Sequence, residues 1–554
     1  MQGLQHCGLS GSGMHSDGDQ HIGAQYVSVL NSARREQPVC NEKGDKAIVF
    51  DGKIYNCRSL QAQLRDKGHV FVFHNDAEVV LHLYEEYGVH CVDHLHGIFA
   101  FAISDGRRLF LARDRVGFKP LYYTILRQRL FLFASEIKAI LQWPDVPVSF
   151  DMQTFTDNLA LNFPVGRRTF FENVQSVLPG STMMISNSEG VIEINERQYY
   201  RVTVCPDDTW TLRGALDTLK RMLDEAVESH IAGEAEVGIS LSGGLDSSLL
   251  ALVMKQYCPA GLTTFTVADN QSHPDLFHAR RLSAELEARH HVVDFTFDAY
   301  LREIPACLAI EEQPSILTFM PFRFLCQRAS RVVKSCLSGE GADTVFGGLE
   351  EFMDRSTAIR AVGKRLEAVK QWGLKPSLEC AAIIDAILAD SEPAVHLINL
   401  FEINLKDPAT RINLELLAKH SMAAGLELRL PYYDDALVEF VNSLPLRFKA
   451  DVARGIPKYI LKRLAIEKHG TQLFDIVLRR KLGFPMATSL FLRRLNRICV
   501  ETVAPDYARR HEFGRFFPHP LPLVLFDMFH EIFITHRGFP PVEMDIMEFM
   551  RAAN

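Results

Sequence analysis

The sequence lacks the features of membrane, secreted and nucleic-acid-binding proteins. No apolar run approaches the length of a membrane span, and residues 1–6 lack the basic and apolar regions of a signal peptide. The net charge of −8 gives no reason to expect a nucleic-acid partner. The 11 cysteines include no Cys-x-x-Cys pair, which favours reduced thiols over a disulfide framework or a zinc site. We therefore expect a cytoplasmic protein without membrane or nucleic-acid partners.

The chain of 554 residues is too long for one hydrophobic core, so we expect several regions. Short strands and turns interrupted by helices open the chain, as in an α+β layered domain. A stretch with many turn signals follows. Apolar strands then alternate with long helical periodicities, which predicts a doubly wound α/β domain around a parallel sheet, mostly helical beyond about residue 350. The predicted bounds are residues 1–150 for the layered domain, 151–209 for a connecting region, 210–500 for the α/β domain and 501–554 for a C-terminal helical tail.

The stretch SLSGGLDSS at residues 240–248 lies between a short apolar strand and a helix. Its two glycines allow a tight bend and a close approach of the backbone to a ligand. The hydroxyl residues and the amides of the coming helix form a cradle for an anion, and the lysine of a Walker A loop is missing. Asp246 is expected to hold a divalent cation that bridges phosphates. The plain alternative is an ordinary strand-turn-helix corner.

Two further segments carry candidate chemistry. Residues 338–348, SGEGADTVFGG, follow another apolar strand and offer two carboxylates three residues apart. Asp343 would complete a magnesium site with Asp246, while Glu340 would face the reacting carbonyl or amine. Lys458 begins a basic helical stretch and would neutralise the charge that builds up as pyrophosphate leaves. The alternative for Lys458 is a solvated basic helix face.

These segments resemble, in order and spacing, the motifs of glutamine-dependent asparagine synthetases, from about residue 6 to about residue 490. In the second half the similar motifs are SGGLDSS at 242–248, SGEGADTVFGG at 338–348, SMA at 421–423 with LELRLPY at 426–432, and RRKLGF at 479–484. In the first half, DGKIYN at 51–56 looks like the family's NGEIYN, NDAE at 75–78 like SD-x-E, ARDRVGFKPLY at 112–122 like RDRxGxKPLYY, and ASEIK at 134–138 like SEIKAL.

The resemblance implies an Ntn-hydrolase-like, class II glutamine amidotransferase-like domain followed by an ATP-pyrophosphatase domain. It also implies ATP and Mg²⁺ as cofactors and a two-step reaction. A small-molecule carboxylate attacks the α-phosphate to give an acyl-adenylate, and ammonia or another amine then displaces AMP. The implied catalytic residues are Glu340 for adenylation and Lys458 for the second step. The implied metal ligands are Asp246 and Asp343, with Asp275 as a third candidate. The implied ATP and pyrophosphate site is Ser240, Leu241, Ser242, Gly243, Gly244, Asp246, Ser247, Val267, Ser338 and Gly339.

The glutaminase half departs from the family at the residues that the reaction needs. The residue after Met1 is Gln2, where the family has the nucleophilic cysteine with its free amine as the base. Tyr26 replaces an arginine and loses the fork that clamps the glutamine carboxylate. Lys53 replaces a glutamate and puts a cation where the substrate's ammonium should be recognised. The degenerate glutamine site is therefore Tyr26, Asp51 in place of asparagine, Gly52, Lys53 and Asp76, and we expect it to be inactive.

The start of the chain also differs from the family. Cys7-Gly8-Leu9 looks like the family's Cys-Gly-Ile start, but it stands too close in sequence to Asp51 and fits a later family motif better. We therefore expect the first strand of this domain to be missing, through a misplaced start codon or a true truncation. A misplaced start would not explain Tyr26, Asp51 and Lys53.

The sequence leaves three possible functions for this chain. An amide-forming ligase of the asparagine synthetase type is favoured. The first alternative is an intramolecular β-lactam or lasso-type macrolactam synthetase, but β-lactam synthetases carry tyrosine where this chain has Glu340. The second is a catalytically silent paralogue, disfavoured because every ATP and metal position is kept. Thr344, where the family usually has glutamate, is a further departure. The acid, the amine and the oligomeric state stay open, with a homodimer as one candidate.

Overall fold

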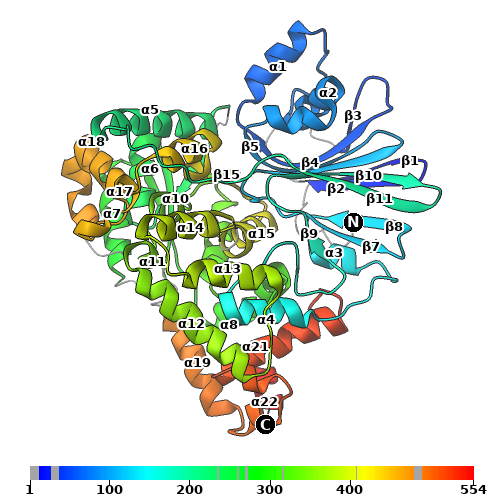
Figure 1. Cartoon of the computed structure of the whole chain (residues 1–554), viewed down its shortest axis with the longest axis vertical. Coiled ribbons are helices and arrows are strands. Elements are labelled where there is room, and N and C mark those ends of the chain that lie inside the picture. The colour runs from blue at the N-terminus through cyan, green and yellow to red at the C-terminus, as the bar shows by residue number, and fades with distance from the viewer. Residues whose placement is uncertain are drawn as a thin grey trace. The chain divides into compact units, whose positions relative to one another are not determined.

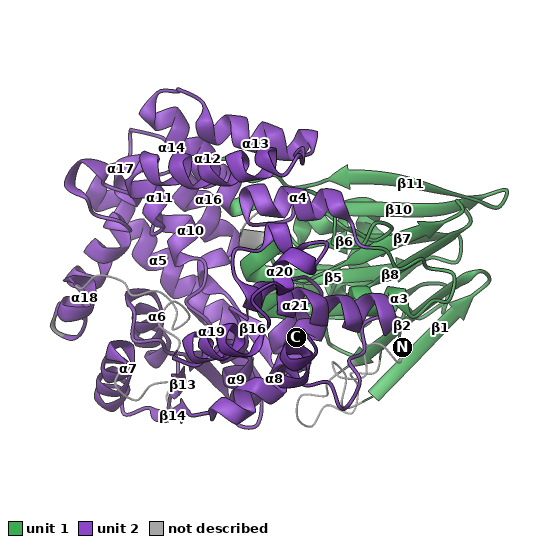
Figure 2. Cartoon of the chain, turned by 90° about the horizontal axis from the view of Figure 1, so that it is seen from below, with its two compact units in different colours: residues 1–149, 166–203, 405–418 green, residues 150–165, 204–404, 419–554 purple. Residues whose placement is uncertain are grey.

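The computed structural model describes residues 11–26, 37–233, 236–258, 261–268, 273–314, 317–406, 409–478 and 490–553. The chain divides into two compact units, coloured separately in Figure 2. Unit 1 comprises residues 1–149, 166–203 and 405–418, and unit 2 comprises residues 150–165, 204–404 and 419–554. Among the described residues, every helix is too short or too polar to cross a lipid bilayer.

Unit 1 is built on a six-stranded antiparallel sheet in the order β11-β10-β6-β5-β4-β3. The central strand β5 is buried at all eight positions, because both faces of the sheet are covered. The strands are β3 (Val39–Cys40), β4 (Ala47–Ile54), β5 (Gly97–Ser104), β6 (Arg108–Arg113), β10 (Ser181–Ser188) and β11 (Val191–Gln198).

Alternation along β4 sends side chains into two separate cores. Ile48 packs in a core with residues of the helices α1 (Cys57–Asp66) and α2 (Asp76–Tyr87) and of the 3-10 helix η2 (Gly88–His94). The next residue, Val49, packs on the other face with residues of a second sheet and a hairpin. The second sheet consists of β7 (Tyr122–Leu126), β8 (Leu130–Ala134) and β9 (Gln175–Ser176), and the hairpin consists of β1 (Gly11–Asp17) and β2 (Gln20–Tyr26). Unit 1 is thus a layered arrangement of helices and antiparallel sheets.

The connecting region expected over residues 151–209 is not a linker in the structure. Residues 166–203 belong to unit 1 and supply β10 and β11, whereas residues 150–165 belong to unit 2 and contain α4 (Met152–Leu161). The turn signal Pro179-Gly180 marks the loop before β10, where Gly180 has a φ of +60°. Turn residues therefore separate strands of one sheet here and do not mark a domain boundary.

A short segment late in the chain also belongs to unit 1. It contains the π-helix η3 (Ala409–Leu414) and the start of α15 (Glu415–Ala423). Glu415 accepts from the buried Arg113 at 2.9 Å and from the Tyr122 hydroxyl at 3.1 Å. The expected tail over 501–554 belongs to unit 2, where Phe513 and Phe526 pack against Phe155 of α4.

Unit 2 contains a five-stranded parallel sheet in the order β14-β13-β12-β15-β16. The strands are β12 (Val237–Ser240), β13 (Thr263–Val267), β14 (Arg289–Val293), β15 (Ser335–Leu337) and β16 (Glu427–Arg429). The chain runs outward from β12 through β13 to β14, and then returns to the other side of β12 with β15. The order therefore reverses between β12 and β15, and ligands bind beyond the carboxyl ends of strands at such a point.

Helices make up most of the remaining chain (Figure 1). The helix before β12 is α5 (Leu212–Ile231), which Thr211 caps and which buries Leu216, Leu219 and Leu223. The helices between the strands are α6 (Leu245–Lys255), α7 (Pro274–Glu285), α8 (Phe297–Glu311) and α9 (Met320–Ala329). The others are α3 (Ile137–Leu141), α10 (Ala342–Phe346), α11 (Glu350–Met353), α12 (Arg355–Gln371), α13 (Leu378–Leu388), α14 (Pro393–Lys406), α16 (Asp435–Ser443), α17 (Leu446–Lys449), α18 (Tyr459–Leu478), α19 (Leu490–Thr502), α20 (Tyr507–Arg510), α21 (Pro520–His530) and α22 (Ile546–Ala552).

Candidate active site

Two glycine-containing loops meet where the strand order of unit 2 reverses. One follows β12 and leads into α6, and the other follows β15 and leads into α10. They are in close contact, because a Cβ added to Gly339 would lie 2.8 Å from the Ser247 amide nitrogen and 3.2 Å from the Asp246 carbonyl carbon. Only glycine at position 339 allows the two loops to lie this close together. The two motifs found in the sequence, almost a hundred residues apart, therefore form one site.

The loop after β12 is held by its own hydroxyl groups. The Ser247 Oγ accepts from the Ser242 amide at 3.1 Å, and the two serine hydroxyls lie 3.0 Å apart. Gly243 has a φ of +75°, and a Cβ there would lie 2.2 Å from the Asp275 carbonyl oxygen. The N-cap of α6 is Gly244, which has no side chain to occupy the first amides of the helix. The first amides of α6 therefore have no side-chain cap, and helix N-termini of this kind suit the binding of an anion.

Lys458 joins the two carboxylates that the sequence assigned to a metal. Its Nζ donates to Asp246 Oδ1 and Oδ2 at 2.7 and 2.6 Å and lies 2.7 Å from Asp343 Oδ1. Lys458 is 4% exposed, so the alternative of a solvated basic helix face is wrong. It lies just before α18, with a φ of +52°. Gly348 leaves the space for it, because a Cβ there would be 2.1 Å from Lys458 Cε.

A cavity adjoins this cluster on the β13 side. Its wall includes Phe265 and Leu325, which present apolar surface, and His273, which caps α7 by accepting from the Asp275 amide at 3.2 Å. These three residues were not predicted as site residues. Phe265 lies on a strand that is buried at every position, so the sequence pattern does not show which of its side chains meets the cavity. The cavity is also lined by five residues that the sequence analysis assigned to ATP or metal: Ser240, Leu241, Ser242, Val267 and Asp275.

Two tyrosines pack against the loop that follows β15, and neither was predicted as a site residue. The Tyr432 hydroxyl donates to the Asp246 carbonyl oxygen at 3.1 Å. The Tyr433 ring packs against Gly341, whose added Cβ would lie 2.7 Å from it. Burial and the nearby charge of Glu340 raise the pKa of Tyr433 above its usual range, so it stays a neutral phenol. Both tyrosines belong to the PYY sequence after β16, the strand next to β15, which explains their position.

In unit 1, the charged residues at the positions expected to hold glutamine pair with other residues of the protein. Lys53 Nζ lies 3.1 Å from Asp76 Oδ2, and the Ile54 amide donates to the same oxygen at 3.1 Å. Asp51 accepts from the buried Lys119 Nζ at 2.8 Å. Gly52, between them on β4, has a φ of +145°, and a Cβ there would lie 2.1 Å from a carbonyl oxygen of β5.

Some of the predicted site residues lie outside the described residues or at their edge. Tyr26 is the last residue of β2, and the residues that follow it lie outside the described part of the chain. The RRKLGF segment at 479–484 and the start of the chain, with Gln2 and Cys7, are likewise outside the described residues.

Comparison with known proteins finds a matching family model for each half of the chain. A family model described as glutamine amidotransferase domain matches residues 1–200, and a model described as asparagine synthase matches residues 218–521. Asparagine synthetase (glutamine-hydrolyzing) 3 of Bacillus subtilis is 29% identical over 515 residues, covering 84% of this chain and 80% of its own length. Asparagine synthetase (glutamine-hydrolyzing) 1 of the same organism is 27% identical and covers 87% and 83%.

The asparagine synthetase (glutamine-hydrolyzing) of Zea mays is 31% identical, covering 83% of this chain and 69% of its own length. The model for the synthase part alone spans more than half of the chain. The order and spacing of the motifs, the two-unit architecture and these matches agree with one another. The chain therefore belongs to the asparagine synthase family.

Proposed function

We propose that this chain is an ATP-dependent amide-forming ligase that activates aspartate, or an aspartate-like acid, as its adenylate. Pyrophosphate leaves in the first step, and ammonia or another amine displaces AMP in the second. One observation carries the proposal: Lys458 binds Asp246 and Asp343 at the meeting point of two glycine loops. We assign unit 2 to the doubly wound ATP-pyrophosphatase fold and unit 1 to the Ntn-hydrolase-like amidotransferase fold.

The first step needs a site for ATP and for the charge on its phosphates. We assign the adenosine to the cavity between Ser240 and Val267, and the pyrophosphate to the amides and hydroxyls of residues 242–247. The oxygens of Asp246 and Asp343 lie close enough together to contact one compact cation, the Lys458 ammonium. The same oxygens therefore suit a hard divalent cation. They would hold Mg²⁺, with Asp275 as a third candidate ligand, and the ion would neutralise phosphate charge. We assign Glu340 to adenylate formation.

The second step develops charge on the carbonyl oxygen and on the departing AMP. Lys458 is a fixed ammonium in a nearly dry site, so it can stabilise that charge without first losing a shell of water. Lys458 fits between the two loops because Gly348 has no side chain, and any side chain at position 348 would displace the lysine. We therefore assign Lys458 mainly to amide formation.

We further propose that unit 1 does not hydrolyse glutamine. The Lys53 ammonium stands where the ammonium of the substrate should be recognised, and it pairs with the retained Asp76. Asp51 is likewise neutralised by Lys119. The two charged substitutions, Asp51 and Lys53, are thus each paired with another residue of the protein, which opposes recognition of the charges of an amino acid. Neither the geometry nor the comparisons favour the lactam synthetase or the silent paralogue.

The proposal is tested by carboxylate-dependent exchange of labelled pyrophosphate into ATP, with a panel of acids that includes aspartate. At least one acid should support exchange, and Asp246→Asn should reduce it by at least about tenfold, a barrier change of about 1.4 kcal/mol. Asp217→Asn is the matched control, since this carboxylate on α5 is 55% exposed and pairs only with the neighbouring turn. Exchange that survives in Asp246→Asn, or an equal loss in Asp217→Asn, contradicts the assignment.

A further inference from the structure

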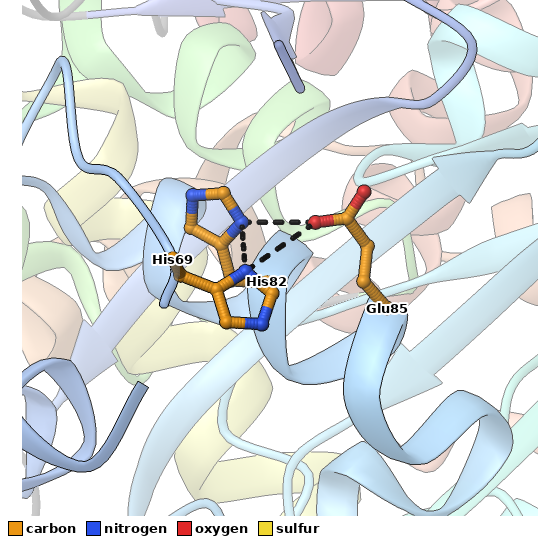
Figure 3. Close-up of side chains that lie close together, drawn as sticks. All are labelled: His69, His82 and Glu85. Atoms are coloured by element: carbon orange, nitrogen blue, oxygen red, sulfur yellow. Dashed lines mark hydrogen bonds and ion pairs between the residues drawn. The ribbon is translucent and has the colours of Figure 1, made fainter. Parts of the chain in front are cut away.

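Unit 1 contains a cluster of His69, His82 and Glu85 that neither the glutamine site nor the ATP site uses. His82 and Glu85 lie three residues apart on α2, so their side chains leave the same face of the helix. His69 comes from the loop between α1 and α2. Figure 3 shows the two imidazole rings and the carboxylate pointing toward one another.

The distances among the three side chains match those of ligands around one ion. The two Nδ1 atoms lie 3.1 Å apart. Glu85 Oε2 lies 2.9 Å from Nδ1 of His82 and 3.8 Å from Nδ1 of His69. Zinc ligands about 2.0–2.2 Å from a common ion lie roughly 3–3.5 Å from one another, and the three distances bracket that range.

A second set of contacts orients two of the three groups, His69 and Glu85. His69 Nε2 lies 2.9 Å from Glu86 Oε1, within hydrogen-bond distance, whereas Glu42 Oε1 lies 3.9 Å from His82 Nε2 and acts on it through its charge alone. The Asn41 amide donates to Glu85 Oε1 at 2.7 Å, which leaves Oε2 toward the imidazoles. A carboxylate behind the outer nitrogen of a histidine is the usual support for a metal ligand, because it fixes the tautomer that exposes the other nitrogen.

Burial and charge also suit a cation. His82 is 2% exposed, and His69 and Glu85 are 14% and 19% exposed. With neutral imidazoles, Glu42 and Glu85 bring two negative charges to the cluster, while Glu86 is neutralised by Lys67 at 2.9 Å. A divalent cation would balance these two charges. Glu85 is the less exposed of the two carboxylates, and a cation beside it offsets part of the cost of removing its charge from water.

We propose that His69, His82 and Glu85 bind one divalent transition metal of the zinc class, with water as a fourth ligand. Two imidazoles and one carboxylate suit Zn²⁺ better than Mg²⁺ or Ca²⁺, which prefer oxygen ligands alone. The ion fastens the loop over residues 67–75 to α2. That loop ends at Asn75, the N-cap of the helix on which Asp76 lies, so the metal supports the wall of the former glutamine site.

The experiment uses the full chain with any histidine tag removed, treated with a chelator and dialysed. Zn²⁺ is titrated against a chromophoric competitor, and Co²⁺ is followed by its visible absorption. The ligand variants are His69→Ala and Glu85→Gln. The control is His90→Ala, because His90 also lies 2.9 Å from a carboxylate, that of Asp93, but is 62% exposed and outside the cluster. Glu86→Ala removes the acceptor that supports His69 and should weaken binding roughly 10–100-fold.

The proposal predicts one Zn²⁺ per chain and cobalt absorption, kept in His90→Ala and lost in His69→Ala and Glu85→Gln. Zinc should raise the melting temperature of the wild type and of His90→Ala, but not of the two ligand variants. Melting curves without metal show whether each variant is folded. Absence of stoichiometric uptake by the wild type, or equal uptake by folded His69→Ala and Glu85→Gln, overturns the proposal in favour of a proton-sharing cluster.

Discussion

Replacing Lys458 with methionine should separate the two half-reactions. Methionine keeps most of the length of the side chain and removes only the ammonium that contacts Asp246 and Asp343. Adenylation depends mainly on the phosphate loop and on the cation that those carboxylates hold. Amide formation depends on charge that appears only in its transition state, where a fixed ammonium has its effect.

The expected loss follows from the burial of this group. An exposed ion pair contributes at most about 1 kcal/mol, because water screens it. Lys458 is 4% exposed, so the range for a well-placed donor applies, about 3–4 kcal/mol or a factor of about 10²–10³ in the rate of amide formation. Adenylation should change by less than about tenfold. The ammonium also competes with a divalent cation for the same oxygens, so the variant should need less Mg²⁺ for half-maximal exchange.

Two assays on the same preparation test this prediction. Exchange of labelled pyrophosphate into ATP reports the first step, and mass spectrometry of the amide product reports the second. Lys468→Met is the matched control, since this lysine of α18 pairs at 2.8 Å with Asp224, outside the proposed site. Equal loss of both activities would assign Lys458 to structure alone, and unchanged amide formation would remove it from the mechanism.

Three other results are expected. The purified chain should release no glutamate from glutamine, measured with a glutamate-coupled assay, and release at the rate of pyrophosphate formation would refute the inactive glutaminase. Gly339→Ala should lower pyrophosphate exchange more than about tenfold, because its Cβ would lie 2.8 Å from the Ser247 amide nitrogen, and a normal rate would show that the two loops tolerate separation. Burial lowers the pKa of Lys449, which stacks on Phe401, from 10.5 to about 7. The unfolded chain therefore binds an extra proton above about pH 7, so stability should rise toward pH 10 by at most about 1.4 kcal/mol per pH unit. Urea denaturation of Lys449→Met should lack this rise, and a fall with pH in the wild type alone would contradict the sign.

Local features of the site could be predicted because neighbouring residues determine them. The strand before residue 240, the glycine bend and the helix after it follow from a short apolar run, residues without bulk and helical periodicity. The position of Lys458 could not be predicted in this way. It depends on contacts with Asp246, 212 residues away, and on the space beside Gly348, so the sequence pattern placed it on a helix that in fact begins one residue later. The roles of the glutamine-site residues came from family resemblance and not from their chemistry.

The predicted domain bounds differ from the two compact units for a related reason. Turn residues in 166–203 looked like a linker, although residues 191–198 alternate in exposure as an edge strand does. The return of Glu415 to unit 1 depends on an ion pair with Arg113, 302 residues earlier, which no local pattern reveals. The cluster of His69, His82 and Glu85 was not predicted, because cysteine spacing gives no sign of it and His69 comes from a separate loop. A histidine and a glutamate three apart on one helix face were the available signal.

The most direct test of the central claim is the product analysis of one complete reaction. The chain is incubated with ATP, Mg²⁺ and the acid that supports pyrophosphate exchange, with either ammonium or glutamine as the nitrogen source. Chromatography then measures nucleotides, pyrophosphate and amide. We predict AMP, pyrophosphate and amide in equal amounts with ammonium and no amide with glutamine. Formation of ADP and phosphate, or equal amide formation from glutamine, would contradict the account.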